Sequence, residues 1–261
     1  FKFMAVSYGG GLIGLAVISL VLSRRYINET FRTAFQRSSG GSSEMWKNEA
    51  LTYRNTYILL ATSFVLLVGL FVLDGMGFAA ALLVVISYFL FWMANARLYG
   101  LAGIQARGAE HGNALFRVLM WPTAPDPPTR EYVLAAYYSR RGMDSPDSIS
   151  GGAIFSGFNS YKMASLTGTS NSGVLKVMLT ATVITPIVTY ITFIWLCYIY
   201  GGTVFANGSV LVNIQQFFNY SNPARWINFP AKEPLAPYVA AGFIIVAVLE
   251  YLHARFVWFP F

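Results

Sequence analysis

Residues 57–96 decide the fold, and they read YILLATSFVLLVGLFVL, then DGMG, then FAAALLVVISYFLFWMANA. The two apolar runs, 57–73 and 78–96, are separated by the turn Asp74-Gly75-Met76-Gly77. A helix rises about 1.5 Å per residue, so about 20 apolar residues cross the hydrocarbon core of a membrane. Four residues leave room for a tight turn and nothing else. The stretch therefore predicts an antiparallel pair of transmembrane helices.

Three further apolar runs of this kind occupy 4–22, 175–200 and 237–252. The chain is 56% hydrophobic and 11% charged, whereas soluble domains carry about 25% charged residues. This composition excludes a water-soluble globule. It predicts an all-α, polytopic transmembrane helix bundle of about five spans, forming one membrane domain over 1–261. Neither end has a polar tail, so we expect a fragment of a longer chain, with the missing remainder or other membrane helices as partners in the lipid bilayer.

The basic residues predict the orientation of the five spans. Segments 23–56 and 97–174 hold most of the Lys and Arg residues, whereas the opposite side keeps Lys2, Arg225 and Lys232. Cytoplasmic loops are enriched in basic residues. We therefore expect a plasma-membrane protein with its N-terminus outside and its C-terminus in the cytoplasm. The net charge of +7 is explained by this bias and by lipid headgroups, so no nucleic-acid partner is expected.

The segment 97–174 is predicted to be a long cytoplasmic loop. Within it, 130–141 has the pattern of a short amphipathic helix at the membrane surface. The stretch 148–173 is rich in Gly, Ser, Thr and Asn, and we interpret it as a plain loop in preference to a re-entrant segment buried against the bundle.

A stripe of threonines follows one face of the run 175–200. Thr182, Thr185, Thr189 and Thr192 are spaced by 3, 4 and 3 residues, which places their hydroxyls together on a helix. Pro186 lies among them and frees the carbonyl four residues earlier, so we expect a bend that acts as a hinge. The stripe could line a substrate pathway, or it could pack against a neighbouring helix.

Two other polar residues in the apolar runs are candidate site residues. Asn95 lies on a face with Tyr88, Trp92 and Tyr99, and either points into the bundle or anchors the helix at the interface. Glu250 either pairs with a nearby Arg or Lys or serves as an ion-coupling carboxylate. His253 follows Glu250 at i+3, but a metal centre of that type needs a second such pair, so no metal site is predicted.

The glycines of the first run also have a pattern. Gly9, Gly11 and Gly14 match a dinucleotide motif that requires a strand before it, whereas Gly10 and Gly14 match the spacing of close helix packing. We favour packing. The sequence contains no nucleophile elbow and no P-loop, so no catalytic residue and no cofactor is predicted.

Two stretches resemble a known group of proteins: 155–164, FSGFNSYKMA, and 252–260, LHARFVWFP. They are similar to the C-terminal part of large, uncharacterised archaeal and bacterial polytopic membrane proteins, which look distantly similar to oligopeptide transporters. The resemblance implies a permease-like protein with a small-molecule substrate. The alternatives are a non-catalytic membrane subunit or scaffold and, third, a membrane-embedded enzyme.

Overall fold

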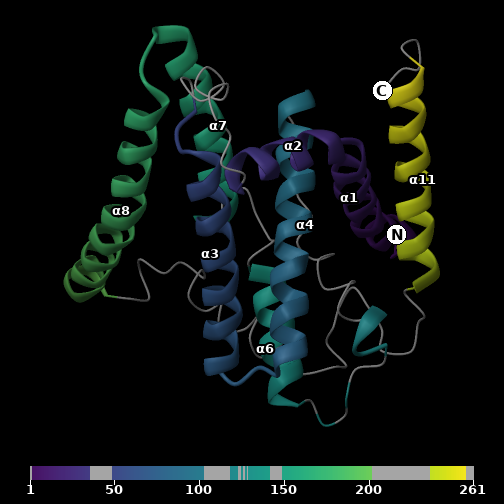
Figure 1. Ribbon diagram of the computed structural model, residues 1–261. Coiled ribbons are helices and arrows are strands. Elements are labelled where there is room, and N and C mark those ends of the chain that lie inside the picture. The colour runs from purple at the N-terminus through teal and green to yellow at the C-terminus, as the bar shows by residue number, and fades with distance from the viewer. Residues whose placement is uncertain are drawn as a thin grey trace.

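A computed structural model describes residues 2–35, 49–102, 118–122, 125, 127, 129–141, 149–201 and 236–256. These residues form a bundle of α-helices (Figure 1). The predicted all-α fold is confirmed. Four helices are long and apolar enough to cross a membrane, and the number rises to five if α1 and α2 together form one bent span.

The predicted hairpin is present as α3 (Tyr53–Leu73) and α4 (Phe78–Ala102), which run antiparallel (Figure 1). The backbone N–H groups of Gly75 and Met76 donate to the carbonyls of Val72 and Phe71, which satisfies the end of α3. Gly75 has a φ of 100°, a conformation that side chains with a Cβ rarely adopt. The turn chemistry therefore follows directly from the DGMG sequence.

The first predicted span forms α1 (Lys2–Leu22), but the chain then continues as a second helix, α2 (Arg24–Phe35). The two helices meet at an angle of 61°. The break falls where the apolar run changes to Ser23-Arg24-Arg25. Thr30 of α2 forms a hydrogen bond of 2.8 Å to the hydroxyl of Tyr57, which holds α2 against the start of α3.

The segment 97–174 differs from the predicted loop in three ways. The helix α4 continues beyond Ala96 to Ala102. The helix α6 (Arg130–Arg141) confirms the predicted helix, but one face of it packs into the bundle: Tyr132, Ala135 and Ala136 are completely buried, whereas Arg130 is exposed. Its first residues contact the Asp74–Gly77 turn, so α6 starts at the end of the bundle opposite to the one predicted.

The interpretation of 148–173 as a plain loop is wrong. Most of this stretch forms α7 (Ile149–Thr167), which ends at Gly168, where φ is 71°. Small residues let the helix approach its neighbours: Gly157 and Ala164 are buried, and Gly157 lies against Met178 of the next helix. Gly157 and Ala164 thus serve helix packing.

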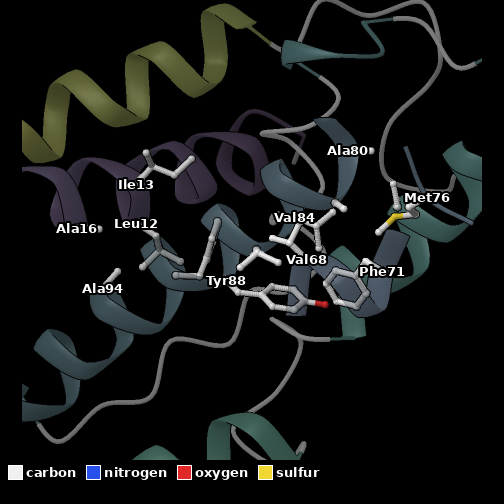
Figure 2. Packing of buried hydrophobic residues seen from close by; sticks show 14 of the residues in the cluster. Leu12, Ile13, Ala16, Val68, Phe71, Met76, Ala80, Val84, Tyr88 and Ala94 are labelled. Carbon is white, nitrogen blue, oxygen red and sulfur yellow. The ribbon is translucent and has the colours of Figure 1, made fainter. Parts of the chain in front are cut away.

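The main core is formed by α1, α3 and α4, with Ala135 of α6, and α11 (Ala236–Arg255) packs against α1. Leu12 and Ala16 of α1 lie against the side of α4 that carries Ala94 (Figure 2). A Cβ on Gly10 would collide with the carbonyl oxygen of Val239, and one on Gly14 would come within 2.8 Å of that of Phe243. The predicted packing role of these glycines is confirmed, with α11 as the partner.

The remaining long helix, α8 (Asn171–Tyr200), stands at the edge of the bundle beside α7 (Figure 1). None of its residues is buried in the described part of the chain. The helix is continuous through Pro186.

Candidate charged site between α4 and α11

A buried ion pair joins the two helices. The Nε atom of Arg97 on α4 lies 2.6 Å from Oε1 of Glu250 on α11. Glu250 is 2% exposed and Arg97 is 31% exposed. The acid is therefore enclosed by the bundle, whereas its partner is reached from outside the core.

Helical spacing explains why Glu250 is buried. Val239, Phe243 and Val246 of α11 all contact glycines of α1. Glu250 follows at i+4 from Val246 and so continues the same face of α11. A carboxylate on this packing face loses water, and Arg97 supplies the compensating charge.

Each charge of the pair depends on the presence of the other. Two charges removed from water are held together only if both remain, and removing one partner leaves an uncompensated charge in the interior. Arg97 and Glu250 therefore stabilise each other across the two helices.

Arg255, the basic residue that follows Glu250 on α11, has a different contact. Its guanidinium lies 5.7 Å from the ring centre of Tyr251. The partner of Glu250 is instead 153 residues away in sequence. Sequence analysis identified the acid and left its partner open.

The polar-aromatic face of α4 contacts α6 and α7. The hydroxyl of Tyr88 donates to the carbonyl of Tyr138 at 2.5 Å, and that of Tyr99 donates to Oδ1 of Asn159 at 2.9 Å. Asn95 is half-buried, and its Oδ1 atom is enclosed with no hydrogen-bond partner among the described residues. Asn95 and Arg97 are two positions apart, which places them on different faces of α4.

The threonine stripe is not part of this site. All four threonines are exposed, and the Thr182 hydroxyl donates to its own backbone at Met178, at 2.8 Å. Nothing in the described structure brings Thr185, Thr189 or Thr192 to Glu250 or Asn95. The pathway and hinge roles of the stripe and Pro186 stay predictions.

A second polar cluster, which sequence analysis missed, closes the α3–α4 turn. Arg130 donates to the carbonyl of Asp74 at 2.9 Å, and the Gly77 N–H donates to Glu131 Oε1 at 3.1 Å. The Tyr138 hydroxyl donates to Oδ2 of Asp74 at 2.5 Å. This hydrogen bond to Asp74, together with burial, raises the pKa of Tyr138 to about 12. The turn and 130–138 are too far apart in sequence for a pattern to connect them.

Four or five apolar helices of spanning length define an integral, polytopic helical membrane protein. A family model described as "Family of unknown function (DUF6785)" matches residues 1–261, and the chain belongs to this family. No curated protein matches the chain, and no solved structure does. The match agrees with the resemblance to an uncharacterised family, while the likeness to oligopeptide transporters stays a prediction.

Proposed function

We propose that the protein is a secondary transporter in which Arg97 and Glu250 form the ion-coupling centre. The single observation that carries the proposal is the buried Arg97–Glu250 pair, because ionisable residues inside a membrane bundle are costly and usually functional. If the pair contributed to stability alone, an apolar contact at the same place would do as well.

The unequal exposure of the pair supports an exchange mechanism. Arg97 is about one-third exposed and can meet an anionic group of a solute, whereas Glu250 is enclosed by the bundle. Protonation of Glu250 would weaken its hold on Arg97 and so link proton binding to solute binding. This mechanism couples two sites on α4 and α11 through one charge, without a separate ion cavity.

A transport assay on the purified chain tests the proposal. Vesicles that contain the protein and carry an imposed pH gradient would be placed in a panel of labelled amino acids and short peptides, because the resemblance points towards oligopeptide transporters. We expect uptake above that of protein-free vesicles, and Glu250→Gln should abolish its dependence on the gradient. Glu29→Gln, which changes an exposed acid on α2, is the matched control. Gradient-dependent uptake that Glu250→Gln leaves unchanged would refute the coupling role.

A non-catalytic membrane subunit is the second candidate, and α8 favours it. This helix is apolar, of spanning length and unburied in the described structure, and it carries a hydroxyl stripe of the kind that packs between helices. In the assay above, a subunit gives no uptake of any solute. Co-purification of a membrane partner, lost when Thr185 and Thr189 are replaced by leucine, would support it.

A further inference from the structure

An apolar groove follows the outer side of the α3–α4 hairpin. Its volume is about 500 Å³, within the range of ligand pockets. Val65, Leu73 and Phe78 are more than half exposed, so the groove opens at the bundle surface. Every lining residue lacks a polar side chain: Phe64, Val65, Val68, Gly69, Val72, Leu73, Phe78 and Leu82.

The length of the groove matches one leaflet of a bilayer. From Phe64 to Leu73 the helix rises about 14 Å, whereas the hydrocarbon core is about 30 Å thick. The groove runs from the middle of α3 to its end at the turn, which is the course of an acyl chain between the midplane and the interface.

Charged groups of both signs lie where the groove ends. Leu73 directly precedes Asp74, whose carbonyl accepts from Arg130. Glu131, the next residue of α6, lies against Gly77, the residue before Phe78. The guanidinium is a forked donor suited to phosphate. One carboxylate oxygen of Asp74 accepts from Tyr138 and one of Glu131 accepts from Gly77, so an ammonium group would bind at the second oxygen of each.

We propose that this groove binds a phospholipid with an ethanolamine-type headgroup. One acyl chain fills the groove, the phosphate meets Arg130, and the ammonium lies between the carboxylates of Asp74 and Glu131. Because the described residues of the cluster include two acids and one base, an anionic headgroup without an ammonium is disfavoured. The inference is independent of transport.

Lipid retention by the full chain tests the proposal. The protein would be extracted from vesicles of equal parts phosphatidylethanolamine and phosphatidylglycerol, and bound lipids counted by native mass spectrometry. We expect phosphatidylethanolamine on the wild type. Gly69→Leu should fill the groove and remove it, and Gly100→Leu is the matched control, because a Cβ at either glycine meets nothing within 4 Å.

A substitution at Arg130 tests the contact with the headgroup. Arg130→Gln removes a charge-assisted hydrogen bond, so retention should fall roughly tenfold. Arg54→Gln, at an exposed arginine on the start of α3, should retain the lipid. Equal retention of the two lipids by the wild type, or unchanged retention in Gly69→Leu, overturns the proposal. A co-purifying protein helix that blocks the groove would also overturn it.

Discussion

At the scale of the residue, the buried charge of Glu250 has the largest consequences for stability and function. Its neighbours on α11 contact glycines of α1, so the carboxylate lies on a packing face, where an apolar residue would be expected. Retaining an acid there costs stability unless Arg97 is present. The pair therefore makes separable predictions for stability and for function.

Arg97→Ala should destabilise the protein by about 3–5 kcal/mol, because it leaves the Glu250 carboxylate buried and uncompensated. Replacing both residues by apolar ones, Arg97→Met with Glu250→Leu, should restore most of that stability. Thermal unfolding in detergent measures both effects. The double variant should still lack coupled uptake, and a double variant that transports normally contradicts the proposed centre.

The raised pKa of Tyr138 predicts that the protein loses stability at high pH. Its hydrogen bond to Asp74 raises its pKa from 10.0 to about 12 in the folded protein. A raised pKa means that the folded state holds the proton more tightly, so this contribution is complete below pH 10 and is lost as the pH rises towards 12. The melting temperature of the wild type should fall in this window by more than that of Tyr138→Phe. Parallel curves for the two proteins would show that the hydrogen bond contributes nothing.

At the scale of the element, the contact between α1 and α11 depends on glycine. A side chain at Gly14 would meet the Phe243 backbone, which cannot move away as a side chain can. Gly14→Leu should therefore cost about 1–3 kcal/mol or more by overpacking. Gly100→Leu, where space is open, should leave the melting temperature nearly unchanged. Equal effects of the two substitutions would mean that α1 and α11 are not closely packed.

Sequence patterns predicted the elements whose apolar runs end at charges or turns. The helices α3, α4, α8 and α11 overlap the predicted spans, and the DGMG turn was placed correctly. The helix α7 was missed because Gly and Ser residues are typical of loops, yet Gly157 allows close packing against α8. The place of α6 was missed because amphipathicity alone does not say whether the apolar side meets lipid or protein.

The candidate site was predicted only in part, and for a related reason. Glu250 stood out because an acid in an apolar run is rare. Its partner Arg97 was counted as a loop residue that sets orientation, although α4 extends past it to Ala102. The polar face of α8 was equally visible in the sequence, but no pattern could say which helix, if any, covers it.

At the scale of the whole molecule, the two ends of the bundle differ in charge. Arg24, Arg25 and Arg32 belong to α2, which lies near the start of α3 and the Arg54 end of the hairpin. The opposite end holds the Asp74–Gly77 turn and the start of α6 with Arg130. This asymmetry predicts that α2 faces the cytoplasm and that the turn and the start of α6 face outwards together.

Accessibility of single cysteines tests this arrangement most directly, in a background where Cys197 is replaced by serine. The positions are Asn28 on α2, Phe78 at the turn and Pro127 just before α6, all exposed. In intact cells a membrane-impermeant maleimide should label Phe78→Cys and Pro127→Cys, and it should label Asn28→Cys only after permeabilisation. Labelling of Pro127→Cys and Phe78→Cys from opposite faces, or of all three from one face, would contradict a membrane-spanning bundle with α6 docked on the α3–α4 turn.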